Sequence, residues 1–248
     1  MLKRTLLSLL VALIALGAGV GVEIVLALRR EYLPTEPVLE ISGRFGSEGE
    51  PLNFVVLGDS TAAGVGAGVA DLSYPVRLAR MLAEDGHRVQ LTGLGLSGAR
   101  VKTLLEEQLP LAEEAKPDLV FIGIGANDVT HLTSLGELQD DMATILARLK
   151  ATGATVVMAG APDMRVAAWF EPLRSLAGWR GRRVAVVLAD AAREAGVPVV
   201  PLAEETRDFF AAEPDRYNSS DGFHPSAEGY RVWADAIYPY LRAALAHR

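Results

Sequence analysis

Apolar residues in this chain follow two patterns: short continuous runs and longer stretches with helical spacing. Five runs of four to six residues, interpreted as buried strands, lie at 54–57, 89–94, 119–124, 155–159 and 197–202. Apolar residues at helical spacing predict helices over 76–82, 101–109, 138–149, 182–195 and 230–241. Between the last strand and the last helix, residues 203–220 are expected to form a long loop.

The order of these elements predicts the fold class. Five strands alternate with helices along the chain, and crossover connections between parallel strands are right-handed. The sequence therefore predicts a three-layer α/β/α domain with a five-stranded parallel sheet between two helical layers.

The first 30 residues differ from the rest. Residues 6–28 carry only two polar side chains, Ser8 and Glu23, between basic pairs at 3–4 and 29–30. A helix over this run would span roughly 35 Å at ~1.5 Å per residue, enough for the ~30 Å hydrocarbon core of a bilayer. We predict an uncleaved signal anchor with an exported domain. The alternative is a signal peptide cleaved near Gly17, which would leave a secreted protein.

Composition sets the remaining boundaries. We divide the 248 residues into the apolar segment 1–30, a linker at 31–50 that is rich in proline and glycine, and a single domain at 51–248. The net charge of −7 argues against a nucleic-acid-binding protein, which would need a basic surface. The chain contains no cysteine, which excludes a disulfide framework, a thiolate metal site and a cysteine nucleophile.

Candidate site residues follow four of the five predicted strands. Ser60 comes after the first strand, Gly98 after the second, Asn127 after the third, and Asp221 with His224 after the fifth. The carboxyl ends of parallel strands share one edge of a sheet, so these residues are expected to converge there.

The residue types are those required for acyl transfer. A serine hydroxyl needs a base to take its proton, and His224 can serve Ser60 in this way. Asp221 can accept a hydrogen bond from the other imidazole nitrogen and so fix the tautomer. The side-chain amide of Asn127 and the backbone N–H groups of Gly98 and Ser60 can hold an oxyanion.

These motifs resemble those of the SGNH/GDSL hydrolase superfamily. The resemblance covers roughly residues 52–245 and rests on Gly58-Asp59-Ser60, Gly98, Gly125-Ala126-Asn127-Asp128 and Asp221-Gly222-Phe223-His224, in family order. It implies a flavodoxin-like sheet and a Ser/Asp/His mechanism without a metal or another cofactor. The implied substrates are carboxylic esters, thioesters, lysophospholipids and acetylated sugars.

Two positions depart from the family pattern. The family often has asparagine where this chain has Gly93, and its name motif has leucine where this chain has Thr61. Asp59 is interpreted as a cap for the local backbone.

Two alternatives use the same residues differently. An acyltransferase would pass the acyl group to a sugar instead of water. A flavodoxin-like binding domain would use the 60–68 loop to hold phosphate through backbone N–H groups. The Asp221–His224 pair favours the esterase, because phosphate binding does not require it.

Overall fold

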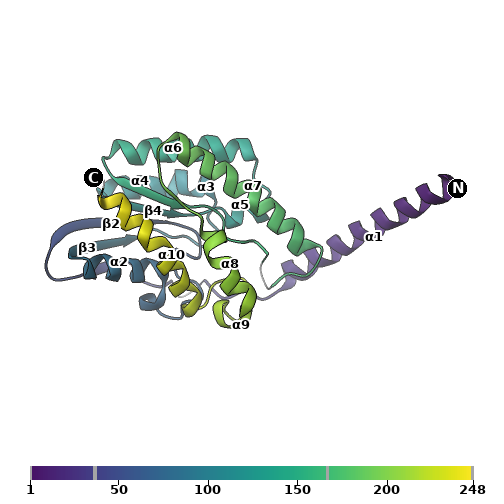
Figure 1. The fold of residues 1–248 in the computed structure, drawn as a ribbon, viewed down its shortest axis with the longest axis horizontal. Coiled ribbons are helices and arrows are strands. Elements are labelled where there is room, and N and C mark those ends of the chain that lie inside the picture. Colours follow the sequence, from purple (N-terminus) through teal and green to yellow (C-terminus); the bar gives the residue numbers. More distant parts are fainter. Residues whose placement is uncertain (1, 36–37, 166–167, 247–248) are drawn as a thin grey trace.

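The computed structural model describes residues 2–35, 38–165 and 168–246. Within these ranges, six strands form one sheet in the order β1-β3-β2-β4-β5-β6 (Figure 1). The strands are β1 (Gly43–Phe45), β2 (Glu50–Gly58), β3 (His87–Gly93), β4 (Leu119–Gly123), β5 (Thr155–Ala159) and β6 (Val199–Val200). Strands β2 to β6 are parallel, and β1 pairs with β3 in the antiparallel sense at one edge. The predicted α/β fold is confirmed, with one additional strand.

Helices cover both faces of the sheet, as Figure 1 shows. One face carries α2 (Tyr74–Glu84), α8 (Leu202–Ala212) and α10 (Ala227–Ala246). The other carries α3 (Val101–Thr103), the π-helix η2 (Leu104–Gln108), α4 (Leu109–Glu114), α6 (Leu135–Ala151) and α7 (Leu173–Glu194). Shorter elements are η1 (Ala70–Leu72), α5 (Ala126–Thr130) and α9 (Pro214–Tyr217).

The alternation of side chains along the strands explains the two cores. Along β2, Val55 and Leu57 face the layer of α6 and α7, whereas Phe54 and Val56 face the layer of α2 and α10. All four are at most 1% exposed. Successive residues of a strand point to opposite faces, so a strand covered on both sides is apolar at every position. For this reason β2, β4 and β5 appear in the sequence as continuous apolar runs, whereas β3 buries only Val89 and Leu91.

Three predictions about individual segments need correction. The expected loop at 203–220 contains α8 and α9, and the helix expected over 182–195 begins at Leu173. The buried face of α8 includes Thr206, whose hydroxyl donates to the carbonyl of Leu202 at 2.6 Å. Because Thr206 is polar, the apolar residues of this segment do not repeat at helical spacing, and the sequence did not indicate the helix. Residues 43–45, within the expected linker, form β1 and extend the sheet.

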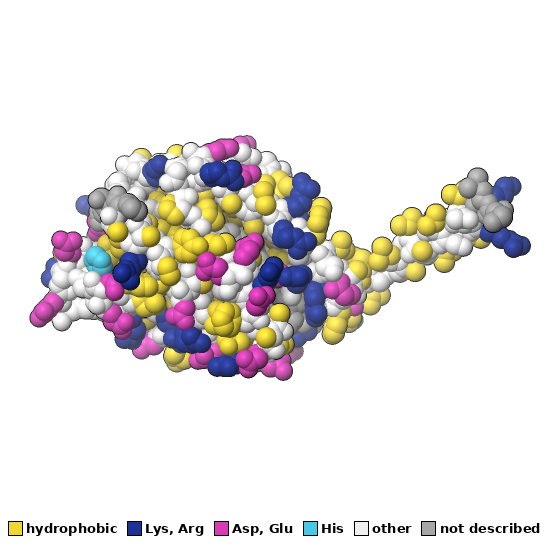
Figure 2. Space-filling model, in the orientation of Figure 1, with side chains coloured by type: hydrophobic (Ala, Val, Ile, Leu, Met, Phe, Trp, Pro, Cys, Tyr) yellow, Lys and Arg dark blue, Asp and Glu magenta, His cyan; other side chains and the backbone are white. Residues whose placement is uncertain are grey.

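The N-terminal helix α1 (Leu2–Arg29) projects away from the domain (Figures 1 and 2). In the described part of the chain, Lys3–Arg29 is the one helix long and apolar enough to cross a membrane. Its leucine, valine and isoleucine side chains are exposed along most of its length. A signal sequence near the N-terminus would have the same features.

Candidate active site

Ser60 lies in a tight turn at the carboxyl end of β2, near the middle of the sheet. The turn begins at Gly58, where a Cβ atom would lie 2.3 Å from the carbonyl oxygen of Gly123 on β4, so only glycine fits. The carbonyl of Ser60 then accepts a hydrogen bond from the N–H of Val65 at 3.0 Å. Asp59 accepts bonds from the backbone N–H and the hydroxyl of Thr61 at 2.9 and 2.8 Å, which is the local capping role expected for it.

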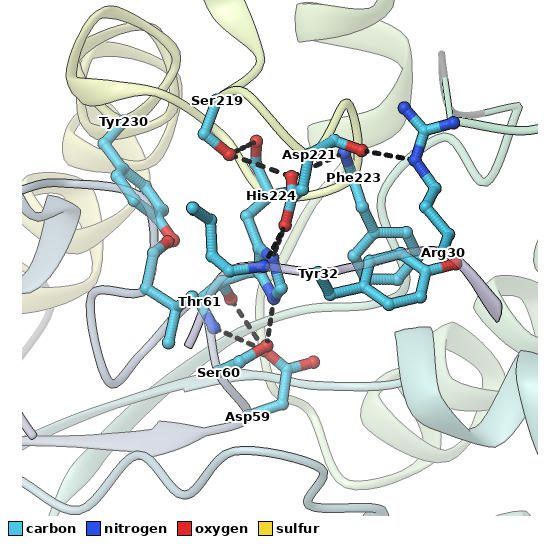
Figure 3. Close-up of polar contacts among 12 residues, drawn as sticks. Arg30, Tyr32, Asp59, Ser60, Thr61, Ser219, Asp221, Phe223, His224 and Tyr230 are labelled. Atoms are coloured by element: carbon cyan, nitrogen blue, oxygen red, sulfur yellow. Dashed lines mark hydrogen bonds and ion pairs between the residues drawn. The ribbon is translucent and has the colours of Figure 1, made fainter. Parts of the chain in front are cut away.

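A chain of hydrogen bonds joins three predicted residues (Figure 3). His224 Nε2 lies 3.0 Å from Ser60 Oγ, and His224 Nδ1 lies 2.6 Å from Asp221 Oδ2. All three residues are buried. An ionised carboxylate can only accept, so Nδ1 carries the proton and the neutral ring presents Nε2 as an acceptor to the serine hydroxyl. The geometry thus places an imidazole nitrogen that can accept a proton next to the hydroxyl of Ser60.

Asp221 is held in its ionised form by several donors. Its Oδ1 accepts hydrogen bonds from the backbone N–H groups of Phe223 and His224 and from the hydroxyl of Ser219, at 2.8, 2.9 and 2.9 Å. Its Oδ2 also accepts from the N–H of Leu33 at 3.2 Å. Burial alone would raise the pKa of Asp221, but the hydrogen bonds from His224 and from these backbone N–H groups outweigh burial and hold the pKa well below its usual range.

Gly98 and Asn127 follow β3 and β4, the strands on either side of β2. Gly98 has a φ of 80°, a left-handed conformation that favours glycine. Asn127 is in the first turn of α5, and its Nδ2 donates to the carbonyl of Ala99 at 3.0 Å. This bond fixes the amide beside the Gly98 turn and uses one of its two N–H groups.

Asp128 joins the loops that follow β3 and β4. Its side chain is fully buried, and Oδ2 accepts a hydrogen bond from the N–H of Val101 at 3.1 Å. Burial raises the pKa of this carboxyl group, although the hydrogen bond from Val101 partly opposes the shift. The bond to Val101 braces the loop that carries Asp128 against the start of α3.

Sequence reasoning missed Gln108, which supports the turn that carries Ser60. This side chain is 3% exposed and projects from the π-helix η2 to the end of β2. Its Oε1 accepts from the N–H of Gly58 at 2.9 Å, and its Nε2 donates to the carbonyl of Gly58 at 2.8 Å. The amide therefore pairs with the backbone as a neighbouring strand would. A glutamine after two glutamates gives no sequence signal of this role.

Other positions also have defined places. Ile41 occupies the space of a side chain at Gly93, where a Cβ atom would lie 2.6 Å from its Cγ2. Trp169 is buried, whereas Phe170 and Trp179 are exposed. Among the described residues, no cluster of three or more histidine, cysteine, aspartate or glutamate side chains could hold a metal ion.

The fold and the site together define a class: a three-layer α/β/α domain with a buried serine, histidine and aspartate linked at the carboxyl edge of a parallel sheet. The chain belongs to the GDSL-like lipase/acylhydrolase family, whose model matches residues 56–232. This confirms the resemblance found in the sequence.

Two similar curated proteins and one solved structure illustrate the relationship. The GDSL-like esterase Rv1075c of Mycobacterium tuberculosis is 36% identical over 200 residues, which cover 79% of this chain and 64% of that protein. Esterase TesA of Pseudomonas aeruginosa is 29% identical over 43% of this chain and 52% of its own length. A crystal structure of TesA superimposes with a TM-score of 0.64 over 77% of this chain and 99% of that one. At 23% identity, this superposition shows a shared fold.

Proposed function

We propose that this protein is a serine esterase that hydrolyses carboxylic esters through an acyl-enzyme on Ser60. The observation that carries the proposal is the hydrogen-bonded chain from Ser60 Oγ through the His224 ring to Asp221, with links of 3.0 and 2.6 Å. Family membership supports it, as do the names of the two curated relatives, both of which are esterases.

In the first half-reaction, Ser60 Oγ attacks the ester carbonyl carbon while His224 Nε2 takes the hydroxyl proton. The tetrahedral intermediate collapses, the carbon–oxygen bond to the alcohol breaks, and His224 returns the proton to the leaving alkoxide. In the second half-reaction, a water molecule loses its proton to His224 and attacks the acyl carbon. The second tetrahedral intermediate collapses, the bond between the acyl carbon and Ser60 Oγ breaks, and His224 returns the proton to Oγ. The carboxylic acid then leaves. Asp221 stabilises the imidazolium in both halves.

The negative charge of each tetrahedral intermediate needs donors. We assign this role to the second N–H of the Asn127 amide and to the backbone N–H groups of Gly98 and Ser60. The bond from Asn127 to Ala99 supports this assignment, because it fixes the donor before the substrate arrives. A preorganised donor needs no reorientation when charge develops.

The substrate class remains a carboxylic ester of a small molecule or a lipid, including an acyl ester, a lysophospholipid or an acetylated sugar. An acyltransferase would share every step up to the acyl-enzyme and differ only in the acceptor. The tautomer fixed by Asp221 is needed for acyl transfer in either case, and it disfavours a phosphate-binding role.

We further propose that α1 remains attached as a membrane anchor for an exported catalytic domain. The apolar run extends over residues 6–28, longer than the ~7–15-residue apolar region of a signal peptide, and this length favours the anchor over the cleaved form. Cell fractionation with N-terminal sequencing of the mature protein tests the proposal. A soluble protein that starts near residue 18 would contradict it.

An alkylphosphonate probe tests the chemistry directly. Full-length protein in detergent should form a covalent adduct, and peptide mapping should place this adduct on Ser60. The Ser60→Ala variant should give neither an adduct nor turnover on a panel of esters with graded acyl length. An adduct on another serine, or none in an active preparation, would contradict the proposal. Accumulation of product only when a sugar acceptor is added would identify a transferase.

A further inference from the structure

The four residues that leave α1, segment 30–33, contact the loop that carries Asp221 and His224. The side chain of Arg30 makes two hydrogen bonds to backbone carbonyls: Nε donates to Asp221 at 3.1 Å, and Nη1 donates to Ala168 at 2.9 Å. Ala168 in turn donates its N–H to the carbonyl of Gly222 at 2.9 Å. Arg30 therefore joins two loops that are separated by more than 50 positions in the sequence. Figure 3 shows the bond to Asp221.

A second contact reaches the carboxylate of Asp221. The N–H of Leu33 donates to Oδ2 at 3.2 Å, the same oxygen that accepts from His224 Nδ1. This donor is one of the groups that lower the pKa of Asp221. It also limits the rotation of the carboxylate, since Oδ1 is already held by the loop's own donors.

A third contact runs through aromatic rings. Tyr32 packs edge-on against Phe223 with ring centroids 5.4 Å apart, and Phe223 packs edge-on against the His224 ring at 5.1 Å. Trp169 completes the cluster: its ring lies 5.7 Å from Phe223, and its Nε1 donates to the Tyr32 hydroxyl at 3.3 Å. Figure 3 shows Arg30 and Tyr32 on the side of the loop that faces away from Tyr230.

We propose that segment 30–33 is a positioning element of the ester-hydrolysis site, which holds the Asp221 loop so that His224 stays aligned with Ser60. The inference rests on the proposed function. Segment 30–33 touches neither the reacting atoms nor Ser60 in the contacts described; it acts through Asp221 and Phe223. The consequence is that the segment immediately after the apolar helix is part of the catalytic unit. A cleavage near residue 17 would retain it, whereas a cleavage beyond residue 33 would remove it.

The test compares two neighbouring arginines in the full-length protein in detergent. Arg30→Ala should lower kcat for a chromogenic short-chain ester about 10-fold or more, with KM within about twofold, because misplacement of a catalytic group by ~1 Å can cost 10²-fold. Arg29→Ala removes the same charge from the same end of α1, and the Arg29 side chain has no hydrogen-bond or ion-pair partner among the described residues. It should keep wild-type kcat. An equal loss in both variants would overturn the proposal.

Leu33 allows a second, backbone-specific test. Leu33→Pro deletes the N–H that reaches Asp221, whereas Leu33→Ala keeps it. We expect kcat of the proline variant to be at least about tenfold below that of the alanine variant at equal KM. If Leu33→Pro fails to fold, Arg30→Ala and Tyr32→Ala still decide the question. Folded Arg30→Ala and Tyr32→Ala variants with wild-type kcat would overturn the proposal.

Phosphonate labelling separates failure of this inference from failure of the proposed function. Wild-type protein labelled at Ser60, together with unchanged labelling rates in the segment 30–33 variants, would overturn only the positioning role. Wild-type protein with neither turnover nor an adduct at Ser60 would overturn both. Slower labelling in Arg30→Ala, with an unchanged melting temperature, is the result we expect.

Discussion

The two sides of Ser60 are built differently. The proposed oxyanion side, Gly98 and Asn127, follows strands β3 and β4, so the register of the sheet sets its position. The proposed proton-relay side, Asp221 and His224, follows no strand directly, because α8 and α9 lie between β6 and this loop. We call these two groups the oxyanion side and the relay side. Its position depends on hydrogen bonds within the loop and on segment 30–33. One side is thus fixed by the core of the domain, and the other by local contacts.

This difference separates catalysis from stability. A change on the relay side removes contacts that are not part of the core. It should therefore lower turnover strongly and change the free energy of unfolding only slightly. A change beneath the oxyanion side disturbs groups that also join the sheet to its loops. The following experiments test that division, from the largest expected effect to the smallest.

The largest effect is expected on the relay side. Asp221→Asn should lower kcat about 10⁴-fold, because an amide no longer enforces the Nδ1–H tautomer of His224 or stabilises the imidazolium. Steady-state kinetics on a soluble ester, with circular dichroism to verify folding, measure this. A folded variant within tenfold of wild type would show that Asp221 does not orient the base.

On the oxyanion side we expect a smaller loss. Asn127→Ala should lower kcat by about 10²–10³, or about 2.7–4 kcal/mol, with KM little changed, because the lost donor acts mainly on the charge that develops in the transition state. Asn127→Asp should be at least as harmful, since a carboxylate repels that charge. Kinetics and melting temperature should be measured together. Wild-type kcat with a lowered melting temperature would show that Asn127 only stabilises the loop through its bond to Ala99 and does not bind the oxyanion.

Gln108 tests the support beneath Ser60. Gln108→Leu should destabilise the domain by about 1–3 kcal/mol, because the N–H of Gly58 loses its partner in a buried place. Its neighbour Glu107 is exposed, so Glu107→Ala should change stability by less than about 0.5 kcal/mol. Denaturant unfolding measures both. Equal stability of the two variants would mean that the Gln108 bridge contributes nothing.

The smallest effect concerns the pH dependence of stability. The contributions of Asp221, on the relay side, and of Asp128, beneath the oxyanion side, should change in opposite directions as pH rises. The pKa of Asp221 is lowered in the folded state, so its contribution to stability is present above the unfolded value of ~3.9 and is lost as pH falls. The pKa of Asp128 is raised by burial, so its contribution is present below ~3.9 and is lost as pH rises.

Unfolding measured between pH 3 and pH 7 tests these signs. Asp221→Asn should lose stability relative to wild type as pH rises through the low end of this range. Asp128→Asn should gain relative to wild type over the same range, since its amide oxygen can still accept from Val101. The same sign for both variants would contradict the contrast between the two sides.

The sequence predicted the catalytic candidates better than their supports. Strand ends followed by Gly-Asp-Ser and by Asn, and a three-residue spacing between Asp221 and His224, are local signals. Whether segments distant in sequence meet depends on tertiary packing, and this hid the pairing of Gln108 with Gly58 and of Arg30 with the Asp221 loop. In the sequence, Arg30 is only a basic flank of the apolar helix. The strand that was not predicted, β1, is three residues long and has no distinctive apolar run.

The short segment between α1 and Asp221 also limits how far Asp221 can lie from the end of the helix. Leu33 comes four positions after Arg29, and even a fully extended chain covers at most about 14 Å over four residue steps. While α1 is embedded in a bilayer, Asp221 therefore stays within about this distance of the end of the helix, however the domain tilts. The site would work at the membrane surface and would have little reach into bulk solvent. An ester at the lipid–water boundary would then need to move only a short distance, mainly along the membrane plane, to meet Ser60.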